Sequence, residues 1–137
     1  MTMGKLITLS AAALVAACAG TPGPGEVGYP YNATGTYSGA FIVDGQPIDA
    51  TLELETARGG AVTGSFRVPM MGIRGEFEGT VAEDQLTFES RYHNPDSGCD
   101  GVASGTVTMG EDGATIEGAI RVRECGEVMA GSMRFRR

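Results

Sequence analysis

Apolar and polar residues alternate with a period of two through most of the chain after residue 34, and Gly, Asp, Asn and Pro interrupt the alternation at short intervals. No segment there has a helical periodicity long enough to predict a helix. The pattern predicts eight β-strands at residues 36–43, 48–54, 61–68, 73–81, 86–92, 99–109, 114–124 and 127–136. Because the connections are short, we expect successive strands to pair as antiparallel hairpins.

A consistent set of strand registers places apolar residues on one face of the sheet and charged residues on the other. The pairings that we expect are Val81 with Leu86, Met109 with Ala114, Val122 with Met129, and Leu52 with both Gly39 and Gly64. Large side chains then lie over glycines on the inner face, where glycine permits the coiling of a small closed sheet. The sequence therefore predicts an all-β, eight-stranded antiparallel up-and-down barrel, with a two-sheet β-sandwich as the alternative.

The predicted domain resembles the avidin and lipocalin-like barrels in strand count, in connection length and in its opening "GTYSGAF" at residues 35–41. The resemblance implies an up-and-down barrel that holds a small ligand. Avidins bind biotin through tryptophans, and this sequence has no tryptophan, so biotin is not implied.

The first residues have the layout of a secretory signal peptide: Lys5, an apolar run over residues 6–17, and small residues before Cys18. The run is too short to span a membrane. The motif Val15-Ala16-Ala17-Cys18 resembles the lipobox of bacterial lipoproteins. That resemblance implies cleavage before Cys18, a diacylglycerol on its sulfur and a fatty acyl group, such as palmitate, on the new N-terminus.

These observations predict a division of the chain into three parts. Residues 1–17 are the predicted signal peptide, and residues 18–33, rich in Gly and Pro, are a predicted lipid-anchored tether in a semi-extended form. Residues 34–137 are about the right length for one barrel domain. The expected location is the cell envelope, and in a Gram-negative host Ala19 after the cysteine implies the periplasmic face of the outer membrane.

Charge argues against nucleic acid as a partner. Without residues 1–17 the chain has nine arginines and no lysine against seventeen acidic residues, a net charge near −8. Binding to phosphates requires a clustered basic face, and only the tail at residues 134–137 is locally basic.

Two cysteines remain once Cys18 is assigned to lipid. The expected register brings Cys99 opposite Glu124, next to Cys125. In an oxidising compartment this pair predicts a disulfide. A zinc site is disfavoured, because structural zinc requires four ligands.

In an up-and-down barrel the connections 1–2, 3–4, 5–6 and 7–8 lie at one end, away from the N-terminus. This rim is the predicted site for a small apolar ligand or an envelope partner, with Met70, Met71, Tyr92 and His93 as its candidate residues. Methionine offers adaptable apolar contacts, although the sequence favours one of the pair as a plug of the barrel end. Tyr92 and His93 are expected to face opposite sides of the sheet, and a surface position beside a turn is the favoured interpretation of His93.

The loop "NPDSGCDG" offers a weak metal-site alternative, because Asn94, Asp96 and Asp100 carry oxygen ligands at alternating positions. A calcium loop of the EF-hand kind also needs a terminal Glu and flanking helices, so turn chemistry explains the loop better. The sequence predicts no metal and no cofactor. With no nucleophile beside a base and a single histidine, it also predicts no enzyme activity.

The sequence thus favours a non-enzymatic envelope lipoprotein. The alternative is a structural or protease-inhibitor-like protein that acts through its surface or through its N-terminal tether, over residues 21–31.

The lipoprotein hypothesis predicts the denatured intact mass of protein recovered from its envelope. We expect a chain without residues 1–17 that carries lipid on Cys18 and an oxidised pair of Cys99 and Cys125. A mature chain without added lipid, or a chain that retains residues 1–17, would contradict the hypothesis.

Overall fold

The computed structural model describes residues 20–137. Its strands are β1 (Gly35–Val43), β2 (Gln46–Thr56), β3 (Ala61–Val68), β4 (Ile73–Ala82), β5 (Gln85–Asn94), β6 (Cys99–Met109), β7 (Thr115–Glu124) and β8 (Glu127–Arg136). Short 3-10 turns, η2 (Pro69–Met71) and η3 (Glu111–Gly113), follow β3 and β6. Within residues 20–137, no helix has the length and apolar character needed to cross a membrane. The predicted signal peptide and the lipid site at Cys18 lie outside the described residues.

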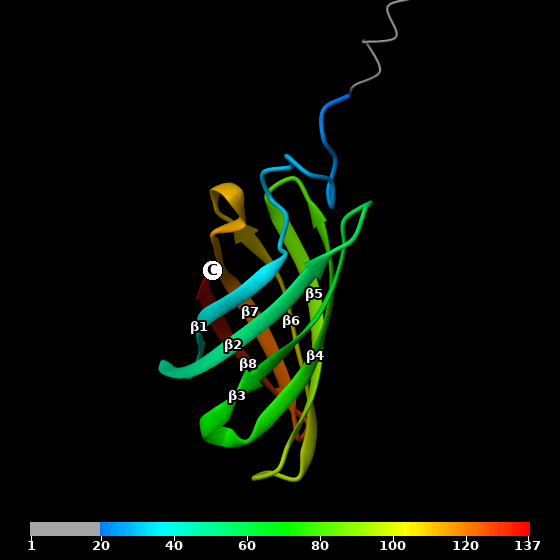
Figure 1. Ribbon diagram of the computed structural model, residues 1–137. Helices are drawn as coiled ribbons and strands as arrows, with labels where there is room; N and C mark the ends of the chain where they lie inside the picture. Colours follow the sequence, from blue (N-terminus) through cyan, green and yellow to red (C-terminus); the bar gives the residue numbers. More distant parts are fainter. Residues whose placement is uncertain (1–19) are drawn as a thin grey trace, which may run out of the picture.

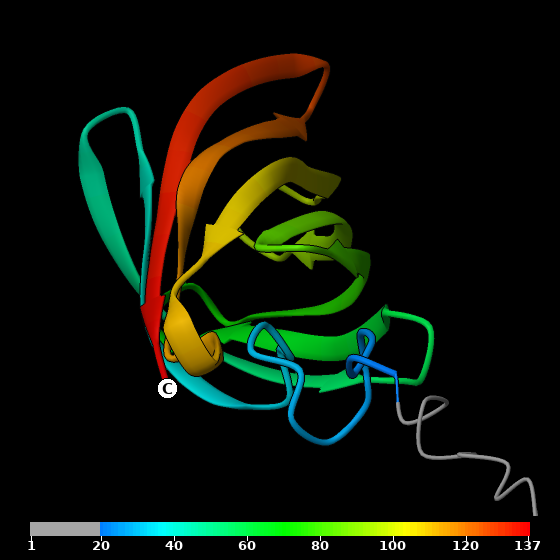
Figure 2. The ribbon, with the colours of Figure 1, turned by 90° about the horizontal axis from the view of Figure 1, so that it is seen from above.

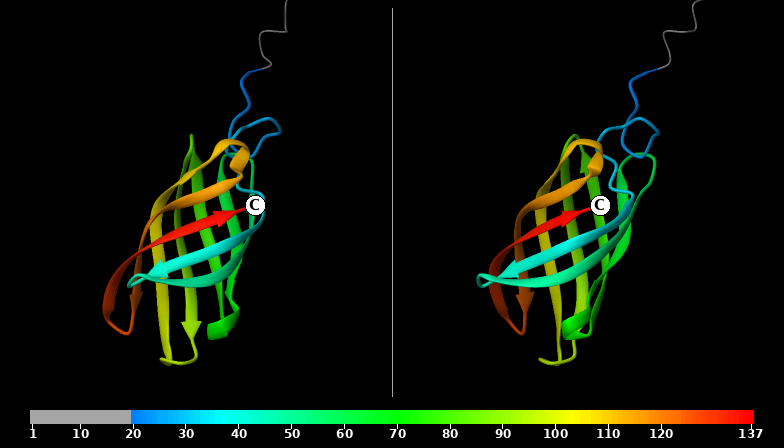
Figure 3. Two further views of the ribbon diagram at one scale, coloured as in Figure 1. Left: turned by 90° about the vertical axis from the view of Figure 1, so that its left-hand side faces the viewer. Right: turned by 60° about the vertical axis from the view of Figure 1, so that its left-hand side comes forward.

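The eight strands form one closed barrel in which each strand is antiparallel to its neighbours. Figures 1 and 3 show the tilted strands from the side, and Figure 2 shows the ring from above. β1 completes the ring by pairing with β8, where Phe41 lies opposite Met133. The predicted up-and-down barrel is confirmed and the β-sandwich is wrong, because closure pairs both edges of a single sheet.

Two hairpins have the predicted registers. Val81 pairs with Leu86 between β4 and β5, and Val122 pairs with Met129 between β7 and β8. The second hairpin turns through Cys125 and Gly126, which have φ values of 51° and 77°. Two consecutive positive φ values are typical of the type I′ turn, whose twist matches that of the strands.

Three other registers are shifted by two residues from the prediction. Leu52 pairs with Tyr37 and Phe66 rather than with Gly39 and Gly64, and Met109 pairs with Ile116 rather than with Ala114. The first hairpin turns at Asp44-Gly45, a favoured type I′ pair, so Val43 pairs with Gln46. Between β6 and β7, η3 takes up the additional residues. A shift of two keeps each side chain on its predicted face.

Large side chains lie over glycines inside the barrel, as predicted. A Cβ atom added at Gly75 would lie 2.0 Å from Cε1 of Phe66, and one added at Gly101 would lie 2.2 Å from Cζ of Tyr92. No other residue type leaves the rings this room. The two rings contact each other edge to face, with centroids 5.9 Å apart.

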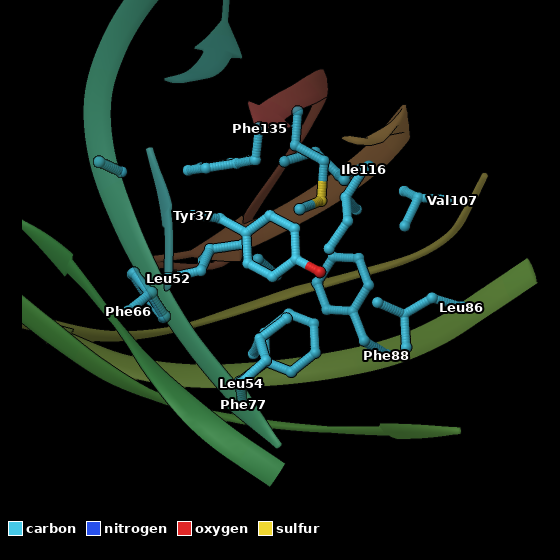
Figure 4. Packing of buried hydrophobic residues seen from close by; sticks show 14 of the residues in the cluster. Tyr37, Leu52, Leu54, Phe66, Phe77, Leu86, Phe88, Val107, Ile116 and Phe135 are labelled. Atoms are coloured by element: carbon cyan, nitrogen blue, oxygen red, sulfur yellow. The ribbon is translucent and has the colours of Figure 1, made fainter. Parts of the chain in front are cut away.

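The half of the barrel where β1 begins is filled by side chains. Tyr37, Leu52, Leu86 and Ile116 have no exposed surface, and Phe77 stacks on Phe88 with ring centroids 4.7 Å apart. Figure 4 shows these rings and aliphatic chains converging on Tyr37. Dense packing of this kind leaves no room for a ligand there.

Residues 20–33 fold across the end of the barrel, which differs from the semi-extended tether that the sequence predicts. Gly59 N–H donates a 2.9 Å hydrogen bond to the Pro24 carbonyl. Within the segment, Asn32 Oδ1 accepts a 2.7 Å bond from Gly25 N–H, and Ala33 is fully buried. The asparagine amide satisfies backbone groups within the segment that an isolated Gly- and Pro-rich chain would leave to water. The bonds from Gly59 N–H to Pro24 and from Ala33 N–H to Thr56 hold the segment on the barrel. The segment lies at the upper end in Figure 1.

The C-terminus closes the same end. The Tyr37 hydroxyl donates a 2.8 Å hydrogen bond to the Gly113 carbonyl, and Arg137 lies 5.9 Å from the centre of the Tyr37 ring. Arg137 Nη1 also donates a 2.7 Å bond to the Thr34 carbonyl. Residues 20–34 and the C-terminal Arg137 therefore close one end of the barrel, which we call the closed end.

The predicted disulfide is confirmed: Cys99 at the start of β6 is bonded to Cys125 in the β7–β8 turn, with Cα atoms 5.5 Å apart. The register shift moves Gly101, rather than Cys99, opposite Glu124. The bridge links two connections at the end of the barrel opposite the closed end.

We expect removal of the disulfide to lower the free energy of unfolding by about 3 to 4 kcal/mol, because the bridge closes a loop of 26 residues in the unfolded chain. The double variant Cys99→Ser with Cys125→Ser, compared with the oxidised protein in urea unfolding, measures this difference. A loss below about 1 kcal/mol would show that the bridge constrains the unfolded chain little.

Candidate functional site

A cavity of about 320 Å³ lies at the end of the barrel opposite the closed end. The connections at residues 44–45, 69–72, 95–98 and 125–126 surround it, and we call this the open end. Asp44 and Gln46, exposed in the β1–β2 turn, form part of its mouth. The volume is near the lower limit for ligand pockets, so the cavity suits a small molecule.

The cavity walls are mainly apolar, and all eight strands contribute to them, with a single residue each from β4, β6 and β8. The apolar lining consists of Phe41, Val43, Ile48, Phe66, Val68, Met71, Ile73, Ala103, Ile120, Val122 and Met129. Phe41 and Phe66 contact each other with ring centroids 5.6 Å apart. They separate the cavity from the filled half of the barrel.

Three polar side chains from β5 and β7 meet at one side of the cavity. Tyr92, Asn94 and Glu124 all line it. Asn94 is buried, and its Nδ2 donates to both carboxylate oxygens of Glu124 at 3.3 Å. Asn94 Oδ1 accepts a 3.0 Å bond from Asp96 N–H, which fixes the orientation of the amide. We call these three residues the polar cluster.

Glycine in β6 lets the tyrosine reach this cluster. Tyr92 on β5 pairs with Gly101 on β6, which pairs with Glu124 on β7. Because Gly101 has no side chain, the Tyr92 ring crosses β6 toward the glutamate. Burial raises the pKa of Tyr92 above its usual value, and the hydrogen bond to Glu124 and the negative charge of Glu124 raise it further. The phenol is therefore neutral beside the carboxylate.

The structure divides the predicted rim residues between the cavity and the outer surface. Met71 and Tyr92 line the cavity, whereas the Met70 residue is 88% exposed beside it. His93 faces outward, as expected from its alternation with Tyr92, and its Nδ1 lies 2.8 Å from an Asp100 carboxylate oxygen. Met71 only partly fills the open end, so it does not act as a full plug.

The proposed calcium ligands are not brought together. Asn94 points into the barrel and belongs to the polar cluster, whereas Asp100 pairs with His93 on the outer face. Asp96 contributes its backbone N–H to the turn. Within residues 20–137, no three His, Cys, Asp or Glu side chains are placed to hold a metal ion.

Sequence reasoning missed Glu124 as a site residue, because the predicted register placed it beside Cys99. A signal was present in the alternation of β7. The inward positions Ile116, Ile120 and Val122 are apolar, and Glu124 continues that series at the strand end. A charged residue at an inward position is a candidate for function or for pairing.

Comparison of the chain with protein families, curated proteins and solved structures finds no match. The resemblance to avidin and lipocalin-like barrels therefore depends on strand count, connection length and the opening at residues 35–41 alone.

The polar cluster generates a prediction for alkaline pH. We expect the phenol of Tyr92 to titrate above the usual value near 10, and Glu124→Gln to lower that pKa because it removes a negative charge beside the phenol. Phenolate absorbance as a function of pH, with Tyr92→Phe as the blank, measures both values. Glu127→Gln is the matched control, because Glu127 pairs with Glu124 across the hairpin but is exposed and outside the cavity.

The raised pKa of Tyr92 also makes the free energy of unfolding depend on pH. Because the pKa of Tyr92 is higher in the folded than in the unfolded protein, its stabilisation is complete below about pH 10 and is lost as the pH rises toward the folded-state pKa. Tyr92→Phe should therefore reduce the loss of unfolding free energy above about pH 10. Equal phenol titrations in the parent protein and in Glu124→Gln would contradict the assigned contact.

Proposed function

We propose that this protein is a non-enzymatic, lipid-anchored protein of the cell envelope that binds a small, largely apolar ligand in the cavity at its open end. The observation that carries the proposal is a cavity of about 320 Å³ with apolar walls and a few converging polar groups. Pockets for small molecules commonly have this composition. The envelope location and the anchor at Cys18 come from the sequence.

The end of the barrel at which the N-terminal segment lies supports an orientation in which the mouth of the cavity faces away from the membrane. The N-terminal segment reaches the barrel at the closed end, where Pro24 and Ala33 are bonded to it. An anchor preceding this segment would leave the open end accessible to ligands.

The inhibitory alternative gains less support. An inhibitory trunk has to enter the active site of its target, whereas residues 21–31 are part of a segment that is hydrogen-bonded to the barrel. Tyr29 and Tyr31 also pack edge to face, with ring centroids 6.0 Å apart.

A cavity-filling variant tests the proposal. We expect Ala103→Phe to weaken binding of the neutral apolar dye N-phenyl-1-naphthylamine by about tenfold or more, or about 1.4 kcal/mol. Ala103 is buried in the cavity wall. Ala119→Phe is the matched control, because Ala119 is exposed on the outer face of β7. Fluorescence titration of the dye measures affinity, and thermal unfolding verifies that each variant is folded.

Two adjacent methionines provide a second test variant and its matched control if Ala103→Phe does not fold. Met71→Gln should weaken dye binding, whereas Met70→Gln should leave it unchanged, because only Met71 lines the cavity. Failure of the parent protein to bind the dye, or equal binding by both members of a pair, would overturn the proposal.

A further inference from the structure

Glu124 is the charged group nearest the apolar depth of the cavity. It follows Val122 and Ile120 on the inward face of β7, and all three side chains line the cavity. The other carboxylate of the lining, Asp44, is exposed in the β1–β2 turn. The cavity lining contains no Arg, Lys or His.

The partners of Glu124 are all neutral. It accepts from Asn94 at 3.3 Å, and the neutral phenol of Tyr92 lies beside it. The ion pairs found in residues 20–137 are Arg58 with Glu26, Arg91 with Glu89, His93 with Asp100, and Arg134 with Glu117. None of them involves Glu124, so a partly buried carboxylate faces the cavity without a counter-charge.

Neighbouring groups hold the side chains of the polar cluster in place. Asn94 is fixed by its bond from Asp96 N–H, and Tyr92 is fixed over Gly101, where an added Cβ would lie 2.4 Å from the hydroxyl oxygen. The disulfide at Cys125 restrains the residue next to Glu124. Because these groups are held by their neighbours, little side-chain freedom remains to be lost when a ligand binds.

We infer that the cavity is selective for a small alkylammonium-type ligand, whose cationic nitrogen donates to Glu124 while its apolar chain lies against Phe41, Phe66 and Ile120. The inference rests on the proposed function and names its ligand class. Glu124 ends β7 at the mouth, and the apolar walls lie deeper, so the charged group of the ligand stays near water. An anionic ligand would meet two carboxylates and no cation in the lining.

The expected preference follows from the strength of such contacts. A hydrogen bond between charged groups is stronger than one between neutral groups, and the low polarity of the cavity limits screening by water. Removal of one partner of such a hydrogen bond lowers the affinity for the ligand by about tenfold to a hundredfold. The net charge of −7 for the whole chain favours approach of a cation over approach of an anion as well.

Three probes with the same chain and different head groups test the inference: octylammonium, octanol and octanoate. We expect the protein with its disulfide intact to bind octylammonium about tenfold or more tightly than octanol, and octanoate more weakly than both. Displacement of N-phenyl-1-naphthylamine, with calorimetry as a second measurement, gives the three affinities.

Glu124→Gln should abolish the preference for octylammonium while octanol binding is retained, because the apolar walls are unchanged. Glu127→Gln is the matched control and should keep the preference, since it removes one negative charge at the same hairpin but outside the cavity. Tyr92→Phe should lower affinity for octylammonium less than Glu124→Gln does, because it leaves the carboxylate in place.

The outcomes separate this inference from the proposed function. Equal affinity for octylammonium and octanol, or a preference that survives Glu124→Gln, would overturn the ligand class and leave the apolar cavity supported. Loss of the preference in both Glu124→Gln and Glu127→Gln would assign it to overall charge and would also overturn the inference. Failure of all three probes to displace a dye that binds would overturn the ligand class, whereas failure of the dye and of all three probes to bind would overturn the proposed function itself.

Discussion

The packing of large rings onto glycines inside the closed sheet is the constraint on which the rest of the structure depends. Closure fixes the space inside eight strands, and side chains have to fill it or leave a cavity. At Gly75 and Gly101 a side chain would overlap Phe66 and Tyr92, so these rings lie flat against the wall. Toward the closed end this packing fills the interior around Tyr37. Toward the open end it stops at Phe41 and Phe66, and a cavity begins.

The same packing determines the chemistry of the open end. Because Tyr92 crosses Gly101, its phenol meets Glu124 two strands away and Asn94 completes the cluster. A carboxylate with neutral partners is costly in an apolar wall unless a ligand or water completes its interactions. The closed end shows the opposite arrangement, since Arg137 is bonded to backbone carbonyls there. At the closed end the polar groups thus bond to each other, whereas at the open end the polar cluster is presented to a ligand that enters the cavity.

Much of the fold was predictable because its information is local. Alternation gives the strands and their faces, and the turn at Cys125-Gly126 gives one hairpin register. The disulfide follows from an even pair of cysteines and a β6–β7 register that is wrong by only two residues, which still leaves Cys99 near Cys125. The registers that were wrong involve the Asp44-Gly45 turn, whose two positive φ values move Leu52 by two residues, and η3, which lengthens the β6–β7 connection. The site was less predictable, because it depends on register: only the observed pairing of Gly101 with Glu124 places that carboxylate beside Tyr92.

The barrel is filled at one end and hollow at the other. A crystal structure determined under xenon pressure would examine both ends in one measurement, because xenon enters apolar cavities that water does not favour. We expect xenon between Phe41, Ala103 and Ile120 at the open end, with none among the rings around Tyr37. An open end in which Met71 and Met129 have moved inward to fill the space, with no xenon beside Ala103, would contradict it.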